Sequence, residues 1–446
     1  MSSTKSALKN SAWLFGEKGA AMALSLSVNV LLARYLQPEN FGVLNYLSAF
    51  MALLIPFASL GLNALVTREL VNKSSMQGTI LATALSTRFF GALLALFLVV
   101  IVVLFISFQS VLADKWFVLA ALANCFTTLY LFDFYFQSKV ASRYVVKVRL
   151  VVLAISSVAK LAAIYFELPL SWFLVVVLLE PVLIGLGFFT AFNLYKKTHE
   201  QSSNNLQWQV NKQYGFELLK ESRWLILSGF MAVIYLKVDL LMLGQLANIE
   251  QVGFYAVAAR LSEVWYFFPG ALVASFFPKL LKLKHAKEDE EREGYNQQLQ
   301  KLCDYLFSGA LILAIVTSFA AHFVIVLLFG EQYQPSAVLL QIHIWAGIFI
   351  FMRALLSKWL IAEHLLKFSL LTHGIAALVN VSLNYYWIPI YGAQGAAWAT
   401  LISYATSSYF VLWLNKSTRV MAWIMTKAIL FPFRIFTMSS AETYKK

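Results

Sequence analysis

The sequence predicts an all-α integral membrane protein, with twelve transmembrane helices arranged as two six-helix lobes. Three observations lead to this fold class. The chain has 446 residues, of which 60% are hydrophobic and 13% charged, whereas soluble domains are about 45–50% apolar. The apolar residues form runs near the roughly 20 residues that cross a bilayer as a helix. The two halves of the chain also share a short pattern, described below. A large soluble catalytic domain is therefore excluded.

Short polar breaks divide the apolar residues into twelve predicted spans. Several breaks contain residues that end helices, such as Gln37-Pro38-Glu39-Asn40 and Pro389 with Gly392. Two longer polar segments, at 196–220 and 285–300, are expected to be solvated connections. The predicted spans lie at residues 11–36, 41–66, 78–107, 115–138, 145–166, 169–195, 220–246, 251–281, 298–329, 335–361, 366–389 and 393–415.

Basic residues are distributed unequally between the two sides of this arrangement. If the termini and every second connection share one side, that side holds 26 of the 35 Lys and Arg residues, and the opposite side holds only Arg34 and Lys115. By the positive-inside rule, both termini are cytoplasmic. The net charge of +13 then reflects orientation and contact with anionic membrane lipids, so no nucleic-acid partner is expected. The tail, 416–446, is expected to be cytoplasmic and to contain an interfacial amphipathic helix.

A short internal duplication predicts the two lobes. The segment 31–36 followed by Phe41-Gly42 resembles the segment 241–246 followed by Val252-Gly253, almost half the chain later. Because six spans precede the second copy, both halves enter the membrane in the same sense, as a parallel repeat with a substrate cleft between the lobes. The predicted domains are an N-terminal lobe (1–195), a cytoplasmic linker (196–219), a C-terminal lobe (220–415) and the tail (416–446).

Ionisable residues inside the predicted spans are the candidate site residues. Each costs about 2.5–3.5 kcal/mol or more if it faces lipid, so it must face another charge, water or an anionic ligand. Some are structural on this reasoning, since Arg260 and Glu263 lie on one helix face and could neutralise each other. The candidate cations for a cavity that holds a phosphate or pyrophosphate are Lys18, Arg88, Lys237, Arg260 and Arg353. The candidate acids, for the cavity or for coupling to a Na⁺ or H⁺ gradient, are Glu17, Asp133, Glu180, Asp239 and Glu263.

Other residue types indicate transport rather than catalysis. The aromatic pair Trp265 and Tyr266 lies deep enough in its span to be a candidate sugar contact. Cys125 and Cys303, the only cysteines, are far apart in apolar segments and indicate neither a disulfide framework nor a metal site. The sequence contains no recognised catalytic motif. We therefore expect no catalytic residues, no metal and no cofactor.

Five segments of the sequence resemble the polysaccharide (Wzx-type) flippases of the multidrug/oligosaccharidyl-lipid/polysaccharide (MOP) exporter superfamily. They are 10–19, 32–46, 237–244, 252–263 and 391–397. The resemblance implies the twelve-helix MOP exporter fold and alternating access. It also implies that the protein moves an undecaprenyl-pyrophosphate-linked oligosaccharide to the outer leaflet of a bacterial inner membrane, for O-antigen, capsule or exopolysaccharide synthesis. The polymerase and chain-length machinery are the partners it suggests. The family's motif charges correspond to Glu17, Lys18, Lys237, Asp239, Arg260 and Glu263.

Two alternatives stay open at this point. A multidrug or small-solute antiporter could use the same scaffold, although seven bases against six acids within the spans favour an anionic cargo. A membrane-embedded glycan polymerase or ligase belongs to a different class. The short outer connections and the absence of a catalytic cluster in the sequence count against it.

Overall fold

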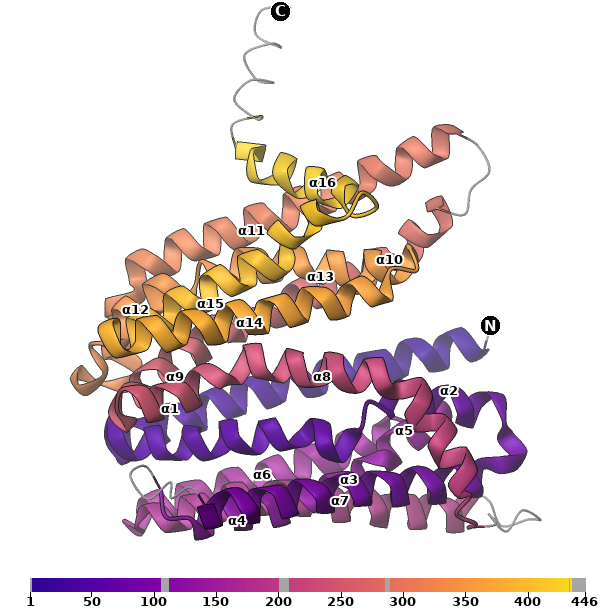
Figure 1. The fold of residues 1–446 in the computed structure, drawn as a ribbon, viewed down its shortest axis with the longest axis horizontal. Helices are drawn as coiled ribbons and strands as arrows, with labels where there is room; N and C mark the ends of the chain where they lie inside the picture. Colours follow the sequence, from indigo (N-terminus) through magenta and orange to yellow (C-terminus); the bar gives the residue numbers. More distant parts are fainter. Residues whose placement is uncertain (1, 106–111, 200–207, 285–288, 433, 435–446) are drawn as a thin grey trace, which may run out of the picture. The chain divides into compact units, whose positions relative to one another are not determined.

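A computed structural model of the chain describes residues 2–105, 112–199, 208–284, 289–432 and 434. Throughout these residues the regular elements are α-helices and short 3₁₀ helices, and the described part contains no strand (Figure 1). Eight helical segments within it are long and apolar enough to cross a membrane. The predicted all-α membrane fold is confirmed, and the predicted twelve spans are consistent with these segments.

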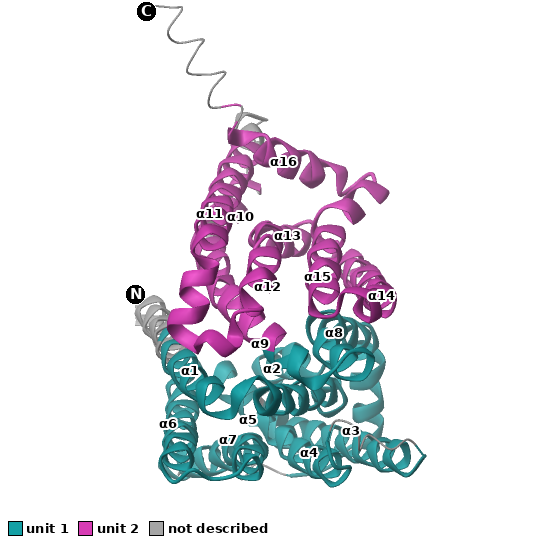
Figure 2. Ribbon diagram, turned by 90° about the vertical axis from the view of Figure 1, so that its left-hand side faces the viewer, with its two compact units in different colours: residues 1–253 teal, residues 254–446 magenta. Residues whose placement is uncertain are grey.

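The chain forms two compact units, residues 1–253 and 254–446 (Figure 2). The helices of unit 1 are α1 (Ser2–Ser59), α2 (Asn63–Asn72), α3 (Gln77–Phe105), α4 (Lys115–Cys125), α5 (Leu131–Ser138), α6 (Arg143–Tyr165), α7 (Leu170–His199) and α8 (Lys212–Leu246). Helix α9 (Ile249–Glu263) begins in unit 1. Unit 2 continues with α10 (Phe267–Lys284), α11 (Asp289–Phe329), α12 (Ser336–His343), α13 (Ala346–Ala362), α14 (Leu366–Tyr391), α15 (Ala393–Ser408) and α16 (Arg419–Ile429). The lobe and linker boundaries expected from the sequence stay a prediction.

Most predicted span ends agree with the helix ends to within a few residues. The break expected at 37–40 is a kink inside α1, because Gln37 adopts a positive φ of 61° before Pro38. Some predicted spans consist of two helices. The span 41–66 is interrupted where Leu60 and Gly61 adopt φ values of 47° and 62°, and the span 115–138 is interrupted by a 3₁₀ turn, η2 (Phe126–Tyr130). Such breaks free backbone carbonyls that need other donors.

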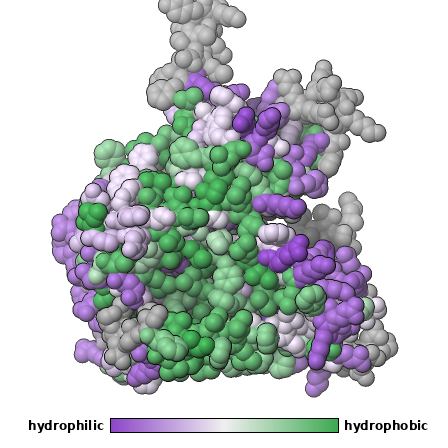
Figure 3. Space-filling view, viewed as in Figure 1, coloured by the Kyte–Doolittle hydropathy of each residue, from purple (hydrophilic) through white to green (hydrophobic). Residues whose placement is uncertain are grey.

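Large apolar side chains are exposed along several helices, as expected for surfaces in contact with lipid. On α3 the side chains of Phe90 and Phe97 are 70% and 62% exposed, and on α11 that of Phe319 is 88% exposed. Hydrophobic residues cover much of the surface visible in Figure 3. Exposed apolar area of this extent is unusual for a soluble monomer.

The tail contains a short amphipathic helix, α16, which packs against the core of unit 2. Helix α16 buries Met421, Met425 and Ala428 in the hydrophobic core of unit 2, while Trp423 is 55% exposed. Its location at a membrane surface stays a prediction. Residues 435–446 of the predicted tail lie outside the described part of the chain.

Candidate functional site

The candidate site is the contact that α8 makes with α1, α2 and α3 within unit 1. At one end of this contact the two duplicated turns meet. A Cβ atom on Gly42 would lie 2.0 Å from the carbonyl oxygen of Ile249, and one on Gly253 would lie 2.0 Å from that of Pro38. Pro38 corresponds to Ile249 in the repeat, as Gly42 does to Gly253. The same contact is therefore made twice, about a local pseudo-two-fold axis.

Close packing continues from this end along α1 and α8. A Cβ atom on Gly244 would lie 2.5 Å from the ring of Tyr46, so only glycine allows the ring to lie there. The hydroxyl of Tyr46 accepts a hydrogen bond of 2.9 Å from the side-chain amide of Gln245. Farther along, Phe57 and Phe230 make an edge-to-face contact with ring centroids 4.5 Å apart. A small residue, Gly244, thus lets the second predicted span, 41–66, pack closely against the seventh, 220–246.

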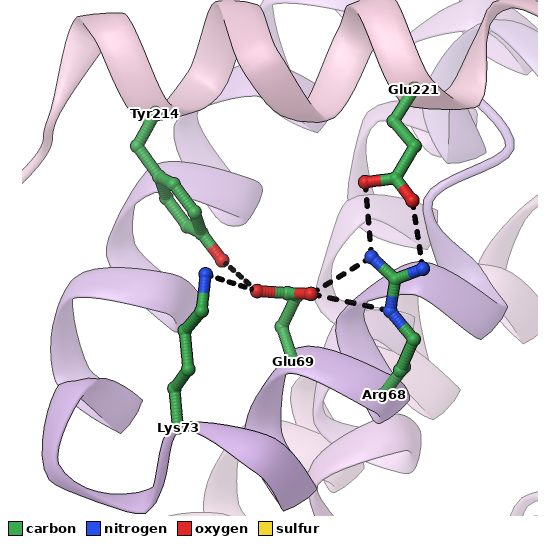
Figure 4. A network of polar contacts seen from close by, with 5 residues as sticks. All are labelled: Arg68, Glu69, Lys73, Tyr214 and Glu221. Carbon is green, nitrogen blue, oxygen red and sulfur yellow. Dashed lines mark hydrogen bonds and ion pairs between the residues drawn. The ribbon is translucent and has the colours of Figure 1, made fainter.

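The opposite end of the contact is polar (Figure 4). The buried carboxylate of Glu69, on α2, contacts three donors: Lys73 at 2.7 Å, Arg68 at 2.9 Å and the Tyr214 hydroxyl at 2.9 Å. Arg68 also binds both carboxylate oxygens of Glu221, at 2.7 and 3.0 Å. Tyr214 and Glu221 lie on α8, so this network joins α8 to α2. We call these five residues the polar network.

The beginning of α8 is positioned by α3. The side chain of Asn211 caps α8 by accepting a hydrogen bond of 3.0 Å from the backbone N–H of Tyr214. The backbone N–H of Asn211 in turn donates to the Thr83 hydroxyl, at 3.0 Å. These bonds place Tyr214 opposite Glu69.

Arg88 binds carbonyl groups at breaks in other helices. Its side chain is buried and donates to the carbonyl of Ala58 at 3.0 Å, in the last turn of α1, and to that of Thr127 at 3.2 Å, in η2. A third hydrogen bond, of 3.4 Å, goes to the side-chain oxygen of Asn63, the first residue of α2. Helix ends leave carbonyls without intrahelical donors and carry partial negative charge, and a cation there is stabilising.

Arg353 makes the same kind of contact in unit 2. Its guanidinium donates to the carbonyl of Ser407 at 2.8 Å, in the last turn of α15. It also donates to the Thr372 hydroxyl at 3.1 Å and to the ring of His373 at 3.0 Å. Both arginines lie within predicted spans and are for that reason among the predicted cavity cations. Each arginine stabilises the end of another helix through its hydrogen bonds. Their role as cavity cations stays a prediction.

Two of the candidate acids have cationic partners within unit 1. The carboxylate of Asp133 contacts the guanidinium of Arg149 at 2.5 Å. The carboxylate of Glu180 contacts Lys160, and the hydroxyl of Ser156 donates to it. These pairs supply the cationic partners that acids within predicted spans need.

The other predicted residues lie on α1, α8, α9 and the segment that follows α9. Asp239 is buried and Lys237 half-buried on α8, while Arg260 is exposed and Glu263 half-buried on α9. Trp265 stacks on Phe268, with ring centroids 5.8 Å apart. Tyr266 packs against the core of unit 2. Glu17 and Lys18 lie within α1, but outside the part of the chain whose side chains are described. The functional roles of these residues stay predictions.

Sequence reasoning did not identify the polar network. In the sequence, Arg68 and Lys73 are two bases of the polar break between the predicted spans 41–66 and 78–107. One local signal was available, because Glu69 and Lys73 are spaced i, i+4 and pair on one helix face. No local signal could connect Arg68 to Glu221, which lies 153 residues away.

This all-helical architecture is similar to that of solved membrane transporters. The chain superposes on the lipid II flippase MurJ in an inward closed conformation, with a TM-score of 0.68 and 16% identity. The superposition covers 97% of this chain and 93% of the MurJ chain. The chain also superposes on an inward-facing multidrug resistance MATE family transporter of the MOP superfamily, with a TM-score of 0.66 and 12% identity over 91% and 96% of the two chains. At these identities the likeness shows the fold alone.

Sequence comparison identifies the family. The family model described as "Polysaccharide biosynthesis protein" matches residues 7–284, and the chain belongs to that family. A putative O-antigen transporter of Shigella flexneri is 22% identical over 192 residues, which are 43% of this chain and 44% of that protein. The match thus spans less than half the length of this curated relative. The resemblance seen in the sequence is confirmed.

Proposed function

We propose that this protein moves an undecaprenyl-pyrophosphate-linked oligosaccharide from the cytoplasmic to the outer leaflet of a bacterial inner membrane. The family, described as polysaccharide biosynthesis proteins, and the O-antigen transporter relative support a glycan cargo. The transporter fold supports transport rather than catalysis. The proposal also includes three finer points: the cargo carries a pyrophosphate, it moves to the outer leaflet, and both termini of the protein are cytoplasmic.

The observation that carries the transport mechanism is the reciprocal contact of Gly42 with Ile249 and of Gly253 with Pro38. Alternating access requires that the repeats meet at one end and separate there later in the cycle. This contact has the required form because it joins equivalent turns through closely packed backbone. At the other end, the Arg68–Glu221 pair is half exposed, and pairs of this kind contribute only about 0.2–1 kcal/mol. Both kinds of contact can therefore open during a transport cycle.

Cations within the membrane would hold the pyrophosphate during its passage. Lys18, Lys237 and Arg260 are the proposed candidates, since the guanidinium groups of Arg88 and Arg353 already serve helix ends. Glu17, Asp239 and Glu263 are the proposed acids for coupling to a Na⁺ or H⁺ gradient. Asp133 and Glu180 are weaker candidates because each has a cationic partner.

A multidrug antiporter is the second candidate function. The superposition on a MATE family transporter favours it, because the TM-score of 0.66 is close to that for the flippase. The two proposals differ in cargo, since an antiporter of this kind would move a small soluble molecule and a flippase an anionic lipid.

Reconstituted vesicles distinguish these functions. We would incorporate a fluorescent undecaprenyl-pyrophosphate disaccharide and add a membrane-impermeant quencher, comparing vesicles with and without the protein. The proposal expects the quenched fraction to rise with time only when the protein is present. The same vesicles loaded with ethidium test the antiporter, which would release the dye under an ion gradient. Dye release without lipid movement would contradict the flippase proposal.

A further inference from the structure

The polar network contains an arginine fork that is oriented independently of the partner it binds on α8. Arg68 Nε and Nη2 contact Glu69 at 3.3 and 2.9 Å, on the same helix. Glu69 is itself only 6% exposed and is held by Lys73 and Tyr214. The outward edge of the guanidinium is therefore presented in a fixed direction. That edge binds both oxygens of the Glu221 carboxylate (Figure 4).

A carboxylate that binds an arginine fork through both oxygens has the geometry that a phosphate group also adopts. Glu221 differs from Glu69 in two ways that allow exchange. Its side chain is 49% exposed, and it belongs to α8, which begins the second predicted lobe. Exposed pairs contribute little, whereas the buried contacts of Glu69 would be costly to break. Loss of Glu221 alone would leave Arg68 and Lys73 with one carboxylate, giving a net cationic site.

The internal repeat preserves the cations of this site and not the acid. The positions equivalent to Arg68 and Lys73 in the second repeat are Lys279 and Lys284, at the end of α10. The position equivalent to Glu221 in the first repeat is Asn10, which carries no charge. In the second repeat Lys284 pairs instead with Glu363, at 3.0 Å. The cations are therefore kept while the acid that faces them differs.

We propose that Arg68, supported by Glu69 and Lys73, is an entry site for the phosphate or pyrophosphate group of the cargo, and that Glu221 occupies this site until the group displaces it. The inference rests on the proposed function for the nature of the cargo. Displacement removes the Arg68–Glu221 contact between α8 and α2 and leaves the Tyr214–Glu69 hydrogen bond, so binding of the anion loosens this end of the contact. Exposed cations on the first turns of α8, Lys212 and Lys220, would raise the local concentration of anions.

Binding to the purified protein tests the site without a transport assay. We would titrate farnesyl pyrophosphate, and separately inorganic pyrophosphate, by calorimetry. Glu221→Gln should tighten binding by about two- to sixfold, because an internal competitor worth about 0.2–1 kcal/mol is removed. The matched control is Glu217→Gln, which makes the same charge change one turn earlier on α8. Glu217 is exposed and accepts a hydrogen bond from Gln213.

The arginine variants complete a double-mutant cycle. Arg68→Gln should weaken binding. In the Arg68→Gln background, adding Glu221→Gln should no longer change the affinity. Arg68→Lys should keep part of the affinity. Melting temperatures would establish that each variant is folded. If Glu221→Gln binds both probes more tightly than Glu217→Gln does, the phosphate groups alone are recognised. If it binds only farnesyl pyrophosphate more tightly, the site also recognises the lipid chain. Either result supports the site.

Equal binding by Glu221→Gln and Glu217→Gln with both probes would overturn the inference. So would unchanged affinity in Arg68→Gln. Failure of the proposed function would be seen in the vesicle assay instead. The wild-type protein would then leave the labelled lipid in its original leaflet, whatever the titrations show. If wild type moves the lipid but the Glu221 and Glu217 variants bind alike, the function stands and the entry site does not.

Discussion

Alanine at Gly42 or Gly253 should open the contact between the duplicated turns. Each added Cβ would lie 2.0 Å from a backbone carbonyl oxygen, and ordinary contact begins at 3.4 Å. The turns must therefore separate by about 1.4 Å, since a backbone carbonyl cannot rotate away as a side chain can. Overpacking of this kind costs about 1–3 kcal/mol. If only the closed contact carries that cost, the equilibrium shifts toward the open state by about 5–150-fold.

A matched control separates this effect from the general effect of a methyl group on a helix. Gly229 lies on α8, and a Cβ there would meet no atom within 4 Å. Gly229→Ala should therefore leave the contact closed and should slightly stabilise α8. The double variant Gly42→Ala/Gly253→Ala should cost less than the sum of the two singles, because one separation of the turns relieves both clashes.

Accessibility of a buried cysteine provides the assay. Ala49 is 2% exposed and follows Tyr46 by three residues, which places it on the face of α1 that contacts α8. In a background without Cys125 and Cys303, Ala49→Cys should react with an impermeant maleimide faster in the Gly42→Ala and Gly253→Ala variants than in Gly229→Ala. Export of the glycan should fall in the same two variants. Equal labelling and equal export in all three would refute the reasoning.

Four other perturbations test the orientation, the intramembrane charges and the movement of the turns. In the same cysteine-free background, Glu250→Cys should react with an impermeant maleimide added outside the inner membrane and Lys139→Cys should not; the reverse would show that the orientation is wrong. Arg88→Met should destabilise the protein by about 1–3 kcal/mol for each carbonyl left without a donor, measured as a loss of thermal stability, whereas export loss without destabilisation would indicate a ligand role. Lys18→Ala and Arg260→Ala should stop export while the protein stays folded, and Arg260→Lys should keep part of it; normal export by both alanine variants would exclude a cationic cavity built on them. Asn40→Cys bridged to Gln251→Cys by a short reagent should lose export reversibly, and unchanged export after bridging would show that these turns do not separate.

The helices could be predicted from the sequence because membrane thickness fixes their length. The apolar run 78–107 became α3, Gln77–Phe105, almost residue for residue. Breaks inside spans were harder to predict. The 3₁₀ turn Phe126–Tyr130 contains neither glycine nor proline, and its hydropathy continues that of the flanking helices. The donors that satisfy such a break come from elsewhere, as Arg88 does for Thr127, so the local sequence carries no mark of it.

The two ends of the α8 contact were not equally predictable. Gly42 and Gly253 could be identified because a duplication repeats them and glycine is required where backbones approach closely. The position of Arg88 deep within its predicted span could also be predicted, but the carbonyl groups that it binds could not. Every residue carries a backbone carbonyl, and only the fold shows which carbonyls lack a donor. Arg68 and Glu221 were missed because each sits in an ordinary polar segment, and their pairing depends on where α8 begins.

The symmetry of the two ends suggests how they would open. The glycine contact is made twice about one local axis, so separating the turns breaks both copies together. A partly opened state would therefore keep neither contact. The polar network has no such symmetry, because Glu221 corresponds to the neutral Asn10 and Arg68 to Lys279. Its opening requires loss of the exposed Arg68–Glu221 pair and of the Tyr214–Glu69 hydrogen bond. We therefore expect the polar end to respond in a graded way to anion concentration and ionic strength, and the glycine end to behave as open or closed with little sensitivity to salt, because screening acts on exposed charges and not on packed backbone.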